Sequence, residues 1–303
     1  MLVALGREFV RAKRCVRRFR GSSQPTLVQA SDGLHYIVKF NNRQQRPNLP
    51  FNESVGSEMY RACRLAVPSW KPILVTDSFL EQNPDCWMQT PEGRLRPEPG
   101  LCFGSRFLGD DSIRLLEILP EAYFKRVRNR ASFWLAWLID ICAEKVDNRQ
   151  AVFVDNASGW LEAFFIDHGN LFNGPKADKV THFCVSRYLD LRVYPDVSSK
   201  EILEFQRILS SLDTDKLWQT VQGIPADWRQ ASALDSFACC LDSLSNPVLI
   251  RNVLEAMIDG RTTRTESEPG GCRSKCELQG KVLRLGIQGT WLQRLRGRHS
   301  ACA

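Results

Sequence analysis

The chain has 303 residues, of which 43% are hydrophobic and 25% charged, a composition typical of a globular protein with one large two-lobed domain or two ordinary ones. A membrane span requires roughly 18 uninterrupted apolar residues, and the most apolar stretch, residues 133–142, is shorter and contains Asp140. The net charge of +7 favours phosphate-bearing partners but does not by itself indicate nucleic-acid binding.

The eleven cysteines are scattered without a regular spacing. Most of them, such as Cys63 and Cys142, lie in apolar periods, where a free thiol behaves as a small core residue. Outside those apolar periods, which also contain Cys239 and Cys240, only Cys272 and Cys276 form a close pair, and their spacing is poor for a zinc site. An odd number of cysteines without a secretion signal fits a reducing compartment, so we expect a cytoplasmic protein.

Residues 3–20 are basic and amphipathic, with apolar residues at helical spacing: Leu5, Phe9, Ala12, Val16 and Phe19. A mitochondrial presequence can have the same pattern. However, sequence that looks structured follows without a spacer. We therefore predict a first helix whose apolar stripe packs on the domain.

A β-hairpin is predicted next, because two β-rich runs at 26–30 and 36–40 flank an Asp32-Gly33 turn. Lys39 lies in the second strand, where it would face the same side as Ile37. A lone lysine in a strand is usually solvated. The small-residue turn Gly21-Ser22-Ser23 precedes this hairpin, however, and such a loop can lie over phosphates with a strand lysine beneath it.

A helix with the apolar residues Val55, Met59 and Tyr60 is predicted to start at Asn52, a good N-cap, and to end before Pro68. The helix dipole favours an acid in the first turn, which accounts for Glu53. A compatible alternative is that Glu53 is presented to Lys39, although Glu58 on the same helix could compete. Residues 72–75 are predicted to form a strand, 81–100 a connecting loop, and 115–119 the crossing into a second lobe.

A nearly all-apolar helix from Arg130 is predicted to be buried and to lead into a polar loop containing Asp147. A second hairpin, with strands at 151–154 and 160–166, then ends in Asp167 and Gly169. Asp147 and Asp167 could be ordinary turn residues. Phosphotransferases, however, place a base and a metal ligand side by side on two consecutive loops of this kind.

The remaining pattern to about residue 258 is helical, with predicted starts near Ser199, Pro225 and Pro247. Beyond residue 259 the periodicity breaks down, and Thr, Arg, Ser, Gly and Glu predominate up to Gly271. We predict a mostly disordered basic tail over residues 259–303.

Taken in order, these pieces resemble the HipA-like kinases, especially the stand-alone bacterial form. The resemblance covers about residues 5–258 and depends on an ordered set of short matches: residues 21–25, 32–40, Asn52-Glu53 with Gly56, 103–107, 119–120, 147–153, 166–169, and Ile224-Pro225 with Trp228. It implies an α+β, protein-kinase-like two-lobed fold. Residues 1–115 would form a β-rich, nucleotide-binding N-lobe, and residues 116–258 a mainly helical C-lobe with the catalytic loops.

The resemblance also implies roles for individual residues. Lys39, with the loop Gly21-Ser22-Ser23, would hold the phosphates of ATP, and Glu53 would pair with Lys39. Asp147 would orient the acceptor hydroxyl and accept its proton, while Asp167 would bind Mg²⁺. The expected reaction is ATP- and Mg²⁺-dependent phosphorylation of a Ser/Thr hydroxyl on an unidentified protein or on the chain itself, without direct nucleic-acid binding or a membrane.

The sequence departs from this family's pattern at a position that matters for the metal. Kinases of this kind usually have an Asn five residues after the catalytic Asp, and here that residue is Val152. Gln150 carries an amide nearby and is the candidate metal ligand in its place, with Asn148 as the alternative. Residues 176–181 are also more polar than in this branch. A second hypothesis is therefore a pseudokinase that binds nucleotide or partners without catalysis, and a third, weaker one is nucleic-acid association through the basic ends.

Overall fold

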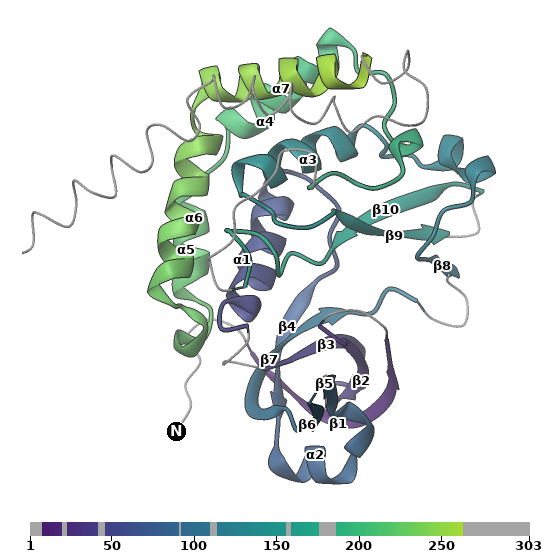
Figure 1. Cartoon of the computed structure of the whole chain (residues 1–303), viewed down its shortest axis with the longest axis vertical. Helices are drawn as coiled ribbons and strands as arrows, with labels where there is room; N and C mark the ends of the chain where they lie inside the picture. Colours follow the sequence, from purple (N-terminus) through teal and green to yellow (C-terminus); the bar gives the residue numbers. More distant parts are fainter. Residues whose placement is uncertain are drawn as a thin grey trace, which may run out of the picture.

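A computed structural model describes residues 8–19, 23–41, 46–90, 92–109, 114–155, 159–175 and 186–262. A β-barrel forms one end of the molecule, and a mainly helical part with a second, small sheet forms the other (Figure 1). None of the described helices is long and apolar enough to cross a membrane.

The barrel consists of β1 (Val10–Arg18), β2 (Thr26–Ala30), β3 (His35–Asn41), β7 (Glu98–Arg106) and β4 (Trp70–Val75), in that order around the closed sheet. The predicted hairpin is confirmed as β2 and β3. Along β3, Tyr36, Val38 and Phe40 fill the barrel, whereas Ile37 and Lys39 face a cleft on the outside. This alternation is the two-residue period of a strand, and it points Lys39 toward the helical part.

The prediction of a helix over residues 3–20 is wrong, because residues 10–18 form strand β1. Val10 and Ala12 point into the barrel, and the register against β2 shifts after Ala12 and again after Cys15. Each such bulge offsets the two-residue alternation, so the apolar residues drift toward a helical spacing. As a strand, this segment pairs with both β2 and β4 and so closes the barrel. A helix at the surface would leave the hydrogen-bonding groups at the edges of those two strands unpaired.

The prediction of a loop over residues 81–100 is wrong in part. This region contains the end of α2 (Asp77–Gln82), the short helix η1 (Pro84–Cys86), the hairpin β5 (Met88–Thr90) and β6 (Gly93–Leu95), and the start of β7. Strands of three residues are too short to show a period, and the polar, Pro-rich composition conceals them.

Helix α1 (Leu49–Ala62) starts four residues earlier than predicted, with Asn48 instead of Asn52 as its N-cap residue and Pro50 in its first turn. Asn52 therefore lies within the helix, and its amide donates hydrogen bonds to the carbonyls of Gly169, Leu171 and Gly174 at 3.1, 2.8 and 3.2 Å. The predictions of Asn52 as N-cap and of Glu53 as a first-turn acid are both wrong. Both side chains are buried and bond to the 167–174 loop instead.

The small sheet has the antiparallel order β10 (Leu161–Ile166), β9 (Gln150–Asp155) and β8 (Arg114–Leu116), and its last two strands in sequence confirm the second predicted hairpin. The short helix η2 (Glu121–Arg126) precedes α3 (Ser132–Cys142). As predicted, α3 is buried nearly all round. Phe133 packs edge-on against Phe165 of β10 at 4.9 Å between ring centroids, which fixes the hairpin on the helix.

The remaining elements are η3 (Leu191–Val193), α4 (Ser199–Ser210), α5 (Thr214–Gln222), η4 (Ala226–Trp228), α6 (Ala231–Leu244) and α7 (Pro247–Thr262). Ser198 rather than Ser199 caps α4, in a capping box with Glu201. Pro225 precedes only the short η4, whereas Pro247 starts α7 as predicted. Helix α7 continues past residue 258, and the predicted tail from residue 263 lies outside the described residues.

Candidate active site

A cleft of about 680 Å³ lies between the barrel and the helical part, within the size range of small-molecule sites. Five of the residues singled out from the sequence line it together: Lys39, Glu53, Asp147, Gln150 and Asp167. Ser23 lines the cleft from the barrel side, whereas Gly21 and Ser22 lie outside the described residues.

Lys39 joins the barrel to the two acidic residues that face it. Its Nζ forms ion pairs with Glu53 Oε1 and, at 2.5 Å, with Asp167 Oδ1. Burial disfavours the ammonium, but the charges of Asp167 and Glu53 outweigh this and raise the pKa of Lys39 above its ordinary value. Lys39 is therefore a buried cation held between two carboxylates. Glu58 does not compete, because it accepts from Trp70 Nε1 and pairs with Arg61.

Glu53 also holds the loop that carries Asp167. Its carboxylate accepts hydrogen bonds from the backbone N–H of His168 at 3.1 Å and from that of Gly169 at 2.8 Å. A Cβ on Gly169 would lie 2.7 Å from Glu53 Oε1, so this close approach requires glycine. One carboxylate thus fixes the positions of β3, α1 and the loop after β10 relative to one another.

Asp167 adopts a left-handed backbone conformation, with φ of +60°. Only a few per cent of non-glycine residues do so, and such strain is concentrated at functional sites. Burial opposes its ionisation, but Lys39 and Lys145 outweigh this and lower the pKa of Asp167. Gln150 Nε2 donates to Asp167 Oδ2 at 2.7 Å, because Gln150 pairs with Ile166 across the β9–β10 ladder and so lies beside the next residue.

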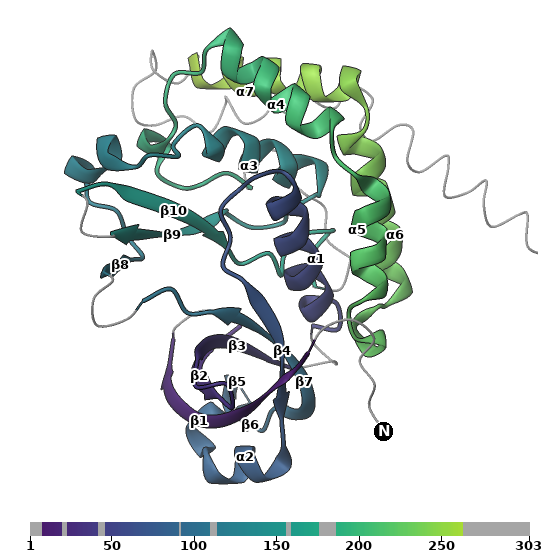
Figure 2. The ribbon, with the colours of Figure 1, turned by 180° about the vertical axis from the view of Figure 1, so that it is seen from behind.

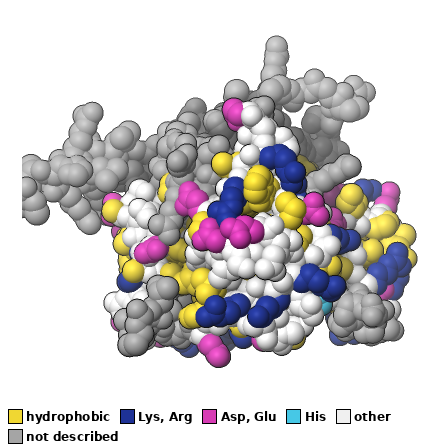
Figure 3. Space-filling model, turned by 90° about the horizontal axis from the view of Figure 1, so that it is seen from below, with side chains coloured by type: hydrophobic (Ala, Val, Ile, Leu, Met, Phe, Trp, Pro, Cys, Tyr) yellow, Lys and Arg dark blue, Asp and Glu magenta, His cyan; other side chains and the backbone are white. Residues whose placement is uncertain are grey.

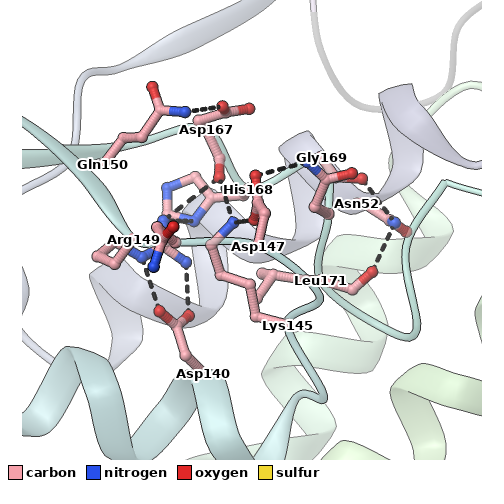
Figure 4. A network of polar contacts seen from close by, with 12 residues as sticks. Asn52, Asp140, Lys145, Asp147, Arg149, Gln150, Asp167, His168, Gly169 and Leu171 are labelled. Atoms are coloured by element: carbon pink, nitrogen blue, oxygen red, sulfur yellow. Dashed lines mark hydrogen bonds and ion pairs between the residues drawn. The ribbon is translucent and has the colours of Figure 1, made fainter. Parts of the chain in front are cut away.

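Asp147 lies in the loop between α3 and β9, with both oxygens engaged and its side chain 32% exposed. Lys145 Nζ pairs with Oδ1, and Asn170 Nδ2 donates to Oδ2 at 2.7 Å. Lys145 Nζ also donates to the carbonyl of Asp167 at 3.1 Å. Lys145 is completely buried, so it links the two acidic loops from beneath, while Asp147 keeps a face toward the cleft (Figure 4).

Arg149 fixes the same loop to the protein core. It donates to both oxygens of Asp140 on α3, at 2.8 and 2.5 Å, and to the carbonyl of Ile166 at 2.8 Å (Figure 4). Tyr60 OH also donates to Asp140, at 2.5 Å. This buried group connects α1, α3 and β10 to the residue before β9, so the loop position depends on the surrounding fold.

His168 is buried beside these residues and packs on Tyr60, with ring centroids 4.6 Å apart. Burial and the charge of Arg149 lower the pKa of His168 well below its ordinary value, so the ring is neutral. Arg149 can only donate to Nδ1, at 3.4 Å, which leaves the proton on Nε2. Within the described part of the chain, Nε2 has no hydrogen-bond partner.

Val152 points into the cleft from the same face of β9 as Gln150, two residues further along the strand. It offers no metal ligand. Asn148 bonds through its amide to the carbonyl of Arg187 at 3.4 Å. Of the two amides considered from the sequence, Gln150 is therefore the one that contacts Asp167.

The donors at Asp167 and Gln150 fit a divalent cation, which they would hold together with water and substrate oxygens. Among the described residues no group of three or more His, Cys, Asp and Glu side chains could enclose a metal. Mg²⁺ needs no such cage, because it commonly takes one or two carboxylates, water and substrate phosphates. Asp167 supplies the carboxylate, and the Gln150 amide oxygen, which faces away from Asp167 in Figure 4, would come into reach by a flip of the amide.

Sequence reasoning did not assign four polar residues to the site that help to organise it: Lys145, Asn170, Asp140 and Asn52. Asp140 is a visible signal, since it is a charge within an otherwise apolar buried helix, and such a charge requires a partner. The other three give no local signal. Their partners lie between two and 122 residues away in the sequence, and no sequence pattern indicates which of those residues the fold brings into contact.

Solved structures similar to this chain include protein kinases. The Helicobacter pylori proinflammatory kinase CtkA is 12% identical with a TM-score of 0.53, and the match covers 81% of this chain and 98% of that one. The fold is that of a protein kinase. The Golgi casein kinase, solved with Mn/ADP bound, matches at a TM-score of 0.43 and 12% identity, over 83% of this chain and 73% of that one. No protein-family model and no curated protein sequence matches the chain.

Proposed function

We propose that the chain is an ATP- and Mg²⁺-dependent, HipA-like kinase that phosphorylates a Ser/Thr hydroxyl on a protein or on itself. One observation carries the proposal: Lys39, from the barrel, bonds both Glu53 and Asp167 in a cleft that Asp147 also lines. The proposal retains a nucleotide-binding N-lobe over residues 1–115 and a catalytic C-lobe over 116–258.

Lys39 would hold the phosphates of the nucleotide by charge and hydrogen bonds, with Glu53 keeping its ammonium in place. Ser23 lies where the loop before β2 borders the cleft. Asp167, assisted by Gln150, would bind Mg²⁺, which neutralises phosphate charge when bound. The apolar lining, including Ile37, supplies a surface for the base.

Asp147 would receive the acceptor hydroxyl. Its oxygens accept one hydrogen bond each from Lys145 and Asn170, and each oxygen has a second lone pair for the hydroxyl proton. The hydroxyl oxygen bonds to the γ-phosphorus, the bond from that phosphorus to the β,γ-bridging oxygen breaks, and ADP leaves with the electron pair. Such a transfer depends on positioning and charge neutralisation, so the buried contacts that hold the Asp147 loop would contribute directly to its rate.

Radiolabelled phosphate transfer tests this proposal. Wild-type protein with ATP and Mg²⁺ should label itself or an added protein acceptor, whereas Asp147→Asn and Asp167→Asn should each lose at least about a hundredfold in rate. Exposed Lys200, on α4 and away from the cleft lining, supplies the control, and Lys200→Ala should retain the full rate. Equal incorporation by wild type and both Asp variants would refute the assignment.

A pseudokinase is the second candidate, and a specific observation favours it. Val152 faces the cleft where a second metal ligand is expected, and both oxygens of Asp147 are already bonded. On this view ATP and Mg²⁺ would raise the melting temperature without turnover on any substrate. Lys39→Ala should abolish the ATP-induced shift under either proposal, and an unchanged shift would remove Lys39 from both.

A further inference from the structure

Strand β1 carries a row of basic side chains that the proposed chemistry does not use. Five of its nine residues are exposed Lys or Arg: Arg11, Lys13, Arg14, Arg17 and Arg18. The two bulges turn neighbouring residues outward together, so the charges are denser than strict alternation would allow. Between residues 11 and 18 they extend over about 23 Å, at about 3.3 Å per residue.

These basic side chains are not paired with the described acidic residues around them, which include Asp85 of η1. Within the described part of the chain, none of the five forms an ion pair with an acidic side chain. The nearby acidic residues of α2, Asp77 and Glu81, pair with Arg96 instead. Figure 2 shows β1 curving along the wall of the barrel, and Figure 3 shows Lys and Arg side chains, with Asp and Glu among them, on the described surface of that end.

The strand also leads directly to the cleft. Phe19, the residue after β1, lines it, as do Ser23 and Pro25 before β2. A chain lying along β1 would thus reach the mouth of the cleft without crossing another element. On its other edge β1 pairs with β4 at Val10 and Arg11, and the backbone N–H of Cys15 donates to Asn83 Oδ1 at 3.0 Å. A peptide lying along β1 would therefore be bound by the exposed basic side chains rather than by pairing with the strand edge.

The chemistry of the strand favours an acidic peptide over other polyanions. Four of the five basic residues are Arg, whose planar fork binds carboxylates with two hydrogen bonds. Single-stranded nucleic acid needs aromatic side chains for stacking, and β1 itself has none. A membrane surface needs exposed apolar residues, and Val16, at 42% exposed, is the single large one on this strand.

We propose that β1 is a docking surface for an acidic, extended segment of a protein partner, which it would guide toward the cleft. The binding surface is independent of the proposed kinase activity; its use in presenting a phosphate acceptor rests on that activity. Arg and Lys on an exposed strand also prevent unwanted strand pairing. Any charged residue serves that purpose, whereas docking predicts affinity for a defined anion.

Fluorescence anisotropy with a labelled ten-residue poly-glutamate peptide tests the docking surface on the full chain at 0.15 M salt. Wild type should bind, and the triple variant Arg11→Gln/Lys13→Gln/Arg14→Gln should bind roughly threefold to a hundredfold more weakly, from three exposed charge contacts. The matched control Lys125→Gln/Lys200→Gln/Lys216→Gln removes the same charge from exposed positions on the helical part and should bind as wild type does.

Equal loss of affinity in both triple variants would overturn the proposal, since net charge alone would then explain binding. So would tighter, β1-dependent binding of duplex DNA or of anionic lipid vesicles. If the β1 variant fails to fold, wild type decides: affinity for poly-glutamate should fall steeply as salt rises from 0.05 to about 0.5 M, and salt-insensitive or absent binding refutes the docking site. None of these outcomes depends on phosphoryl transfer, so they are distinct from failure of the kinase proposal.

Discussion

The buried ion pair between Arg149 and Asp140 allows a quantitative test of how the loop that carries Asp147 is held. Arg149 and Asp140 side chains are 1% and 0% exposed and share two hydrogen bonds. Arg149→Met keeps most of the side-chain volume but leaves the Asp140 carboxylate buried without its cation and the Ile166 carbonyl without its donor. Removing one partner of such a pair costs about 3–5 kcal/mol of unfolding free energy.

The chain contains a matched control for this pair. Arg192 makes the same two-bond contact with Asp190, at 3.0 and 2.7 Å, but the side chains are 53% and 30% exposed. Exposed pairs contribute about 0–1 kcal/mol, because water solvates each partner when the other is removed. Arg192→Met should therefore cost less than about 1 kcal/mol.

Urea unfolding followed by tryptophan fluorescence measures both losses. For a chain of this size, about 3–5 kcal/mol corresponds to a fall of roughly 6–20 °C in melting temperature. The double variant Arg149→Met/Asp140→Leu should recover part of the loss, because it removes the unpaired charge as well. Equal losses of unfolding free energy in the Arg149 and Arg192 variants would refute the reasoning. So would a loss in the double variant larger than the sum of the losses in the two single variants.

Three further predictions concern residues around Asp167. Gly56→Ala should destabilise the fold by about 1–3 kcal/mol, because its Cβ would lie 2.6 Å from Leu171 Cδ1; a stabilised variant, as helix propensity alone predicts, would contradict this in a melting experiment. Lys145→Met should slow phosphoryl transfer on the order of tenfold to a hundredfold while the ATP-induced melting shift remains, and equal effects on both would contradict its link to Asp147. The pKa of His168 is lowered in the folded protein, whereas in the unfolded chain the ring takes up a proton below about pH 6.5, so the unfolding free energy should decrease as the pH is lowered through that range. His168→Gln should reduce this pH dependence by up to about 1.4 kcal/mol per pH unit, and identical pH dependence in both proteins would contradict the burial argument.

The sequence by itself determined the elements whose cause is local. The Asp32-Gly33 turn between two alternating strands predicts one hairpin, and the all-apolar run from Phe133 predicts a buried helix. These predictions give the correct elements around the site residues: a strand that carries Lys39, and a buried helix that leads into the loops with Asp147 and Asp167. The alternation of β3 also predicts, correctly, that Lys39 faces away from the residues that fill the barrel.

Tertiary structure decided what depends on partners distant in the chain. Residues 10–18 have an apolar spacing compatible with a helix, and only barrel closure makes them a strand with two bulges. Asn52 looks like an N-cap until the carbonyls of the 169–174 loop supply a different partner for its amide. Asn170 meets Asp147, and Lys145 meets the carbonyl of Asp167, only because two loops converge. A sequence pattern reports which face of an element is apolar, whereas a buried polar contact requires two specific segments to meet, and that is fixed by packing of the whole fold.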